Sequence, residues 1–120
     1  PLSGAHPPLV VVKKGGAEPA GEAEYVVVGH CCESGDLLTP APDDPEALMP
    51  RTLGEADIGD LVVIEGSGAY CAGMSSKNYN SFPEAAEALL DCAGGLHLIR
   101  NRQPPEQIWS NEVEAPDAQL

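Results

Sequence analysis

Short apolar runs separated by turn residues recur along the chain, and this pattern predicts strands more than helices. Runs of strand character lie at 9–12, 25–28, 61–64 and 96–100, and most are rich in β-branched residues, which pack well on a pleated surface. The first two flank a polar turn and are expected to pair as a hairpin. The run 61–64 is continuously apolar between turn signals, which predicts a strand buried on both faces.

The stretch 83–90 gives conflicting signals. Its alanine-rich composition and its leading proline favour a helix. However, the pair Gly94-Gly95 is a good hairpin turn and is followed by the apolar run 96–100. We therefore expect a strand at 88–91 that pairs back onto 96–100.

Other segments are expected to be irregular or short. The residues 40–46 hold prolines and acids and predict a solvated excursion, after which 48–53 pairs briefly with a neighbour. A short helix is expected at 69–75, and a second from about 104 to 113. The tail 114–120 is polar and is expected to fray.

The composition supports one mainly β domain. The chain has 120 residues, enough for a single core, and its 13 glycines and 12 prolines indicate many turns and short strands. We expect a Greek-key-like barrel or sandwich with one or two short helices. The domain would span residues 1–113, and 114–120 would be its tail.

Charge and cysteine usage exclude several classes of function. The net charge of -13 argues against nucleic acid or an anionic membrane as a partner, because both are polyanions. No apolar run approaches membrane-spanning length, and no signal-peptide pattern occurs. The four cysteines form no Cys-x-x-Cys motif and the three histidines lie far apart, so we expect no metal site and reduced thiols in the cytoplasm. An independent metal or redox protein is the alternative.

The stretch from Gly29 to Asp36 concentrates the candidate chemistry. It follows a strand-like run and ends it abruptly with glycine, which predicts a loop at the end of a strand. Cys32 lies beside Glu33, whose negative charge disfavours thiolate, so this thiol is expected to stay protonated and able to donate a proton. Asp36 is expected to orient the loop by accepting backbone N–H bonds. The alternative is that Cys32 is a small buried hydrophobic residue and that residues 34–36 only form a turn.

Four motifs occur in a characteristic order. They are Val28-Gly29, then Cys-Glu-Ser-Gly-Asp at 32–36, then Gly-Ala-Tyr at 68–70, and then Asn-Tyr-Asn-Ser at 78–81. In this order the chain resembles the pyridoxal-phosphate-dependent decarboxylases of the alanine-racemase-like fold, and among them the members that act on diaminopimelate. The resemblance runs from about residue 2 to about residue 113.

The resemblance implies a function and a cofactor. It implies that the chain is the C-terminal domain of an amino-acid decarboxylase that converts meso-diaminopimelate to lysine with pyridoxal 5'-phosphate. The TIM-barrel domain, with the lysine that holds the cofactor as a Schiff base, would precede Pro1, so the 120-residue chain alone is expected to be inactive. The partners would be that barrel and a second subunit of a homodimer. Lys77 is expected to be an ordinary surface lysine.

The resemblance also assigns roles to three residues. Cys32 would be the proton donor, Glu33 would hold the distal amino group of the substrate, and Tyr70 would contact both cofactor and substrate. Two alternatives remain within the family. One is a decarboxylase of ornithine or lysine, although such members commonly carry aspartate where this chain has Glu33. The other is a non-catalytic regulatory homologue.

Overall fold

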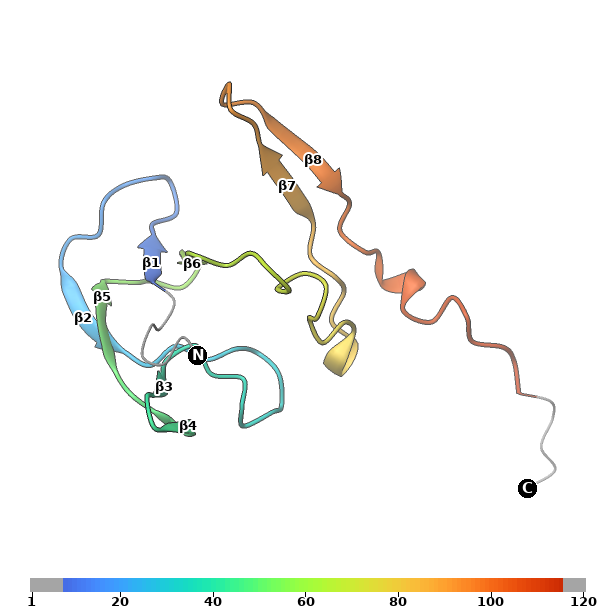
Figure 1. Ribbon diagram of the computed structural model, residues 1–120, viewed down its shortest axis with the longest axis horizontal. Helices are drawn as coiled ribbons and strands as arrows, with labels where there is room; N and C mark the ends of the chain where they lie inside the picture. Colours follow the sequence, from blue (N-terminus) through green and yellow to red (C-terminus); the bar gives the residue numbers. More distant parts are fainter. Residues whose placement is uncertain (1–7, 116–120) are drawn as a thin grey trace. The chain divides into compact units, whose positions relative to one another are not determined.

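The described structure, a computed structural model covering residues 8–115, is built from short antiparallel strand pairs (Figure 1). The chain divides into two compact units, residues 1–74 and 75–120. The expected mainly β class is confirmed. Within residues 8–115 the named strands form two-stranded sheets that do not close into a barrel. The boundaries expected at 113 and 114 stay a prediction.

The described part of the first unit contains six strands. The pairs β1–β6 and β2–β5 each join strands that lie far apart in the sequence. Their bounds are β1 Leu9–Val12, β2 Glu22–Tyr25, β3 Pro40–Ala41, β4 Asp44–Leu48, β5 Arg51–Gly54 and β6 Leu61–Ile64. The strand pairs are β1–β6, β2–β5 and β3–β4. The second unit contains η1 Tyr79–Ser81, β7 Glu87–Leu90, β8 Leu96–Arg100 and η2 Pro105–Gln107.

The hairpin expected between 9–12 and 25–28 is wrong. The strand β1 pairs instead with β6, with Val10 opposite Val63 and Val12 opposite Leu61. A cluster of polar residues accounts for this choice, because it ties the end of β1 to the turn that precedes β6. This long-range tie has no signature in the local pattern of apolar residues.

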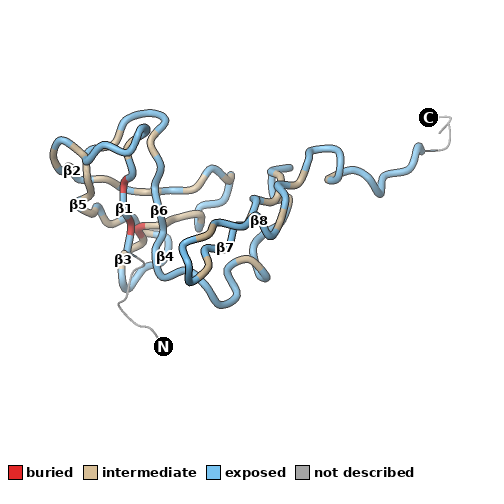
Figure 2. Tube along the Cα trace, turned by 90° about the horizontal axis from the view of Figure 1, so that it is seen from above, coloured by how far each residue is buried: buried red, intermediate tan, exposed pale blue. Residues whose placement is uncertain are grey.

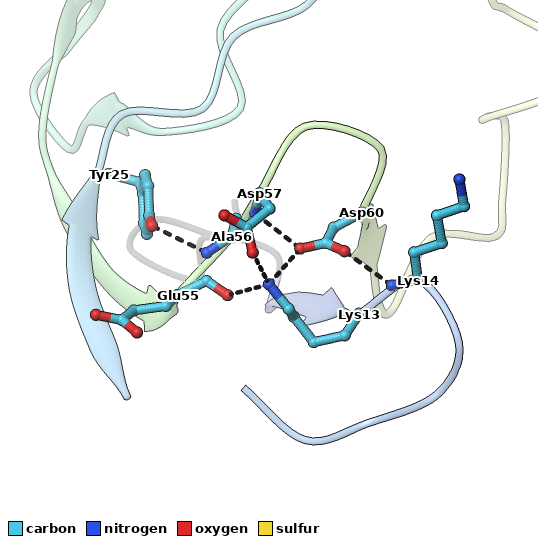
Figure 3. Close-up of polar contacts among 7 residues, drawn as sticks. All are labelled: Lys13, Lys14, Tyr25, Glu55, Ala56, Asp57 and Asp60. Carbon is cyan, nitrogen blue, oxygen red and sulfur yellow. Dashed lines mark hydrogen bonds and ion pairs between the residues drawn. The ribbon is translucent and has the colours of Figure 1, made fainter. Parts of the chain in front are cut away.

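The polar cluster is centred on Lys13 (Figure 3). Its ammonium lies 2.7 Å from Asp57 Oδ2 and 2.7 Å from Asp60 Oδ2. Asp60 also accepts the backbone N–H groups of Lys14, at 2.8 Å, and of Asp57, at 2.7 Å. The hydrogen bond from Lys13, supported by these two N–H groups, lowers the pKa of Asp60 to about 2. The cluster therefore fixes how the chain enters β6.

Burial within the first unit is uneven (Figure 2). In β1, Leu9 and Val11 are buried while Val10 and Val12 are 41% and 38% exposed. All residues of β6 are exposed, so the expectation of a strand buried on both faces is wrong. Opposite residues of an antiparallel pair share a face, so the register places these four together: Val10, Val12, Leu61 and Val63. We call this set the β1–β6 outer face.

The second unit confirms the strand assignment for the contested stretch. The strands β7 and β8 form a hairpin in which Leu90 lies opposite Leu96. Asp91 closes the turn by accepting the N–H groups of Ala93 and Gly95, each at 2.8 Å. Local turn chemistry therefore outweighs the helix propensity of the preceding alanines.

The helix expectations were less accurate. Residues 69–75 form turns rather than a helix, because Tyr70 has a φ of 69°, in the left-handed region that an α-helix excludes. The helix expected at 104–113 reduces to η2. The excursion expected at 40–46 is largely exposed, as expected, and it contains most of the β3–β4 hairpin.

The described residues show neither a membrane-spanning helix nor a cluster of metal ligands. None of their helices is long and apolar enough to cross a membrane. No group of three or more histidine, cysteine, aspartate or glutamate residues in the same range is arranged to hold a metal ion. The four cysteines are free thiols.

Candidate functional site

The loop from Gly29 to Asp36 is closed at its base by backbone hydrogen bonds. The N–H of Gly29 donates to the carbonyl of Asp36 at 2.8 Å, and the N–H of Leu38 donates to the carbonyl of Val27 at 2.9 Å. Between these bonds Val28 and Leu37 form a β-bridge. The loop expected at the end of a strand-like run is therefore present, with its two ends held side by side.

A buried threonine anchors the base of this loop. The Thr39 side chain is fully buried, and its hydroxyl accepts the N–H of Val27 at 3.0 Å. The backbone carbonyl of Thr39 accepts the N–H of Met49 at 3.0 Å. Sequence reasoning missed Thr39. The only available signal was a lone polar side chain directly after the apolar pair Leu37-Leu38.

Asp36 organises the inside of the loop, as expected. Its carboxylate accepts the N–H of Cys31 at 2.9 Å. The same carboxylate lies against the α-carbon of Gly29, where any added Cβ would overlap it. Gly29 is therefore needed for the space that its missing side chain leaves, which is how glycine permits a close approach.

The two adjacent cysteines lie in different environments. Cys31 is half-buried, whereas Cys32 is exposed. Burial raises the pKa of the Cys31 thiol, and the charge and hydrogen bond of Asp36 raise this pKa further. The protonated state that we expected for Cys32 because of Glu33 stays a prediction.

Glu33 is exposed and supports the turn of its own loop. Its Oε1 accepts the N–H of Gly35 at 2.9 Å and lies 3.5 Å from the hydroxyl of Ser34. Both contacts use the same oxygen, so they do not occupy Oε2. The carboxylate can therefore hold the turn and still offer an acceptor to solvent.

Tyr70 lies on a separate turn after β6. The N–H of Met74 donates to the Tyr70 carbonyl at 2.8 Å, and the side chain is 77% exposed. A bulky residue at positive φ is a conformational outlier, and such outliers cluster at functional sites. The structure thus places Cys32 and Glu33 on one loop and Tyr70 on another, with each side chain accessible.

Comparison with known proteins identifies the family. Residues 2–68 match the pyridoxal-dependent decarboxylase, C-terminal sheet domain. The chain belongs to this family. The matched range contains Cys32 and Glu33 but ends before Tyr70, which is reached only by the longer similarities to individual relatives.

The individual relatives of this decarboxylase domain are much longer proteins. The chain is 43% identical over 96 residues to diaminopimelate decarboxylase of Escherichia coli K12, which covers 80% of this chain and 22% of that protein. It is 40% identical over 116 residues to the enzyme of the same name from Streptomyces coelicolor, covering 94% of the chain and 25% of the relative. A crystal structure of diaminopimelate decarboxylase matches with a TM-score of 0.78 at 38% identity, over 92% of this chain and 26% of that one. The chain thus spans about a quarter or less of each of these relatives.

Proposed function

We propose that this domain is the C-terminal part of a pyridoxal-phosphate-dependent decarboxylase that converts meso-diaminopimelate to lysine. The named relatives support this substrate, since their identity to this chain reaches 43%. We propose further that the enzyme works in the cytoplasm, where its four free thiols would stay reduced.

The observation that carries the proposal is the closed loop with two exposed reactive side chains. Cys32 and Glu33 are adjacent and exposed, on a loop whose ends are fixed by backbone bonds and by Thr39. A rigid base that displays a proton donor beside a carboxylate is suited to general acid catalysis on a charged substrate.

The exposed residues after β6 fit the edge of a phosphorylated cofactor. Tyr70 offers a hydroxyl donor, and at Gly66 and Gly68 an added Cβ would meet no atom within 4 Å, so backbone there is open to approach. We assign the main binding site for the anionic phosphate to the barrel domain, because this chain carries a net charge of -13. When bound, pyridoxal phosphate supplies the electron sink for loss of carbon dioxide.

The chain's own residues would then act on the substrate. Cys32 would deliver a proton to the α-carbon after decarboxylation. Glu33 would accept hydrogen bonds from the ammonium at the far end of the substrate, using the oxygen that the Gly35 bond leaves unoccupied. Tyr70 would hold cofactor and substrate in place.

The β1–β6 outer face supports a role within a larger assembly. Contiguous exposed apolar residues usually mark an interaction surface, and these four side chains are between 38% and 64% exposed. We propose that the remainder of the longer protein, an N-terminal barrel, covers this face. We propose also that the enzyme is a homodimer in which the Cys32 loop serves the site of the neighbouring subunit.

The test compares two adjacent thiols in the complete enzyme. Cys32→Ala should lower the rate of carbon dioxide release from meso-diaminopimelate by about 10²–10⁴-fold, the usual contribution of a general acid, while the absorbance of bound cofactor is unchanged. Cys31→Ala is the matched control and should cost much less. Equal losses would mean that Cys32 is not the proton donor. If the unmodified enzyme releases no carbon dioxide from this substrate but does so from ornithine or lysine, the substrate assignment is wrong.

A further inference from the structure

Two neighbouring thiols, Cys31 and Cys32, occupy the loop of the proposed active site, and they differ in their exposure to solvent. Cys32 is exposed and Cys31 is half-buried. The two residues lie in bends rather than in a strand, so no strand alternation decides which of them faces outward. Something in the loop must set this choice.

The contacts identify Asp36 as the group that sets it. Its carboxylate accepts the backbone N–H of Cys31 at 2.9 Å, and its charge and hydrogen bonding raise the pKa of the Cys31 thiol. Cys31 is therefore held on the side of the loop that faces Asp36.

Gly29 makes this arrangement possible. The Asp36 carboxylate occupies the position that a Cβ of residue 29 would take, so the acid can reach across the base of the loop to Cys31. The φ of Gly29 is not in the left-handed region. Alanine at this position would therefore be tolerated by the backbone and would disturb the loop only by displacing the carboxylate.

We propose that Asp36, seated against Gly29, is a positioning residue that retains Cys31 inside the loop and thereby presents Cys32 as the working thiol. The inference rests on the proposed function for the catalytic role of Cys32. The difference in exposure between the two thiols is a property of the loop itself. Asp36 would touch neither substrate nor cofactor and would act only through Cys31 and the backbone.

The variants separate the roles of space, charge and hydrogen bonding. Asp36→Ala removes the acceptor and the charge. Asp36→Asn keeps an oxygen that can accept the Cys31 N–H but removes the charge. Gly29→Ala leaves the Asp36 side chain unchanged but adds a methyl group at the position that the Asp36 carboxylate occupies. Asp43→Ala removes an exposed acid from the β3–β4 turn and is the matched control.

The readout is which cysteine a small alkylating reagent modifies in the complete enzyme. Brief treatment with iodoacetamide, followed by fragmentation mass spectrometry of the peptide that carries both cysteines, gives the ratio of Cys31 to Cys32 modification. In the unmodified protein and in Asp43→Ala, Cys32 should react first. In Asp36→Ala and in Gly29→Ala the share of Cys31 should rise several-fold.

Kinetics provide the second readout and a test of coupling. Misplacing a reacting group by about 1 Å can cost about 10²-fold in rate, so Asp36→Ala should lower kcat with little change in KM, and Asp36→Asn should recover much of the loss. Gly29→Ala acts by displacing the Asp36 carboxylate. The double variant Gly29→Ala/Asp36→Ala should therefore have a kcat no lower than that of Asp36→Ala alone. This non-additivity is expected for residues in direct contact.

The outcomes distinguish this inference from the proposed function. An unchanged alkylation ratio in Asp36→Ala, or additive losses in the double variant, would overturn the inference whatever the enzyme's activity. The unmodified protein could be alkylated first at Cys32, as expected, and yet decarboxylate no amino acid. That result would support the role of Asp36 in the loop and overturn the proposed function.

Discussion

The hydroxyl of Thr39 accepts a hydrogen bond from the backbone N–H of Val27, at 3.0 Å, across the base of the loop from Gly29 to Asp36. Thr39 is the most deeply buried residue of the described chain, with no exposed surface. Buried backbone N–H groups that lose their partner destabilise the fold. This hydrogen bond therefore both stabilises the folded chain and holds the base of the loop in place.

We expect Thr39→Val to lower the free energy of unfolding by about 1–3 kcal/mol, the usual cost of a buried polar group without a partner. Valine has nearly the same shape, so the loss would reflect the hydrogen bond rather than a cavity. Urea denaturation followed by circular dichroism measures it. Thr39→Ser is the matched control, since it keeps the hydroxyl, and a loss as large for serine as for valine would contradict the assignment.

Local patterns predicted much of this fold. The bounds of β1, β6 and β8 were predicted from apolar runs, and the β7–β8 hairpin from its glycine turn. Strand partners were not predictable in the same way. The pairing of β1 with β6 depends on contacts between residues more than forty positions apart, such as Lys13 with Asp57, which leave no periodic signal.

The candidate site was predicted in part. Asp36 could be assigned a role because short acidic side chains commonly accept nearby N–H bonds, and the bond to Cys31 confirms it. The need for space at Gly29, and the burial of Thr39, could not be predicted, because both depend on how the chain folds over itself. The left-handed φ of Tyr70 has no signature in residue type either.

The Lys13 cluster predicts how stability changes in acid. The pKa of Asp60 is held at about 2, below its ordinary value of about 3.9, so its ionised form stabilises the folded state. This contribution is complete above about pH 4 and is lost as the pH falls through about 2. A pH titration of the Asp60 carboxyl carbon by NMR should give the low value directly.

Variants of the two neighbouring lysines test the cause. Lys13→Met should move the pKa of Asp60 upward and lower the urea midpoint at pH 7, because its hydrogen bond is the largest contribution to the shift. Lys14→Met is the matched control, since Lys14 contacts Asp60 through its backbone N–H, which the substitution keeps. If both variants leave the Asp60 pKa unchanged, the cluster does not act as described.

The β1–β6 outer face predicts opposite effects in the isolated chain and in the complete enzyme. Val63→Thr combined with Val10→Thr should reduce aggregation of the isolated chain, because the two side chains lie opposite each other and are each 41% exposed. In the complete enzyme the same pair should lower the melting temperature, because the face would be covered there. Light scattering and thermal denaturation measure the two effects.

A matched substitution pair keeps this test specific. Glu22 and Glu24 are exposed positions of β2, and changing both to threonine alters an exposed strand without touching the outer face. This control should leave the melting temperature of the complete enzyme nearly unchanged. An equal loss in both double variants would show that the β1–β6 outer face is not a buried contact of the longer protein.

The role proposed for Glu33 predicts that it selects the substrate in the site of a neighbouring subunit. Its Oε1 holds the loop by accepting the Gly35 N–H at 2.9 Å, and the amide oxygen of glutamine can accept the same bond. Glu33→Gln therefore keeps the turn and removes only the charge. Hydrogen bonds to an ionised group are roughly twice as strong as neutral ones, so kcat/KM for meso-diaminopimelate should fall on the order of 100-fold, while the absorbance of bound cofactor stays constant.

The subunit that Glu33 serves can be determined by complementation. A homodimer of Glu33→Gln chains should be nearly inactive, and so should a homodimer whose chains lack the cofactor-anchoring lysine of the barrel. In mixed dimers of the two, one site would combine an intact barrel with an intact Glu33 loop from the other chain, and activity should return to about half of the normal level per dimer. Isolated mixed dimers that bind cofactor yet remain inactive would place Glu33 in the site of its own subunit, because in that arrangement each site carries one of the two defects.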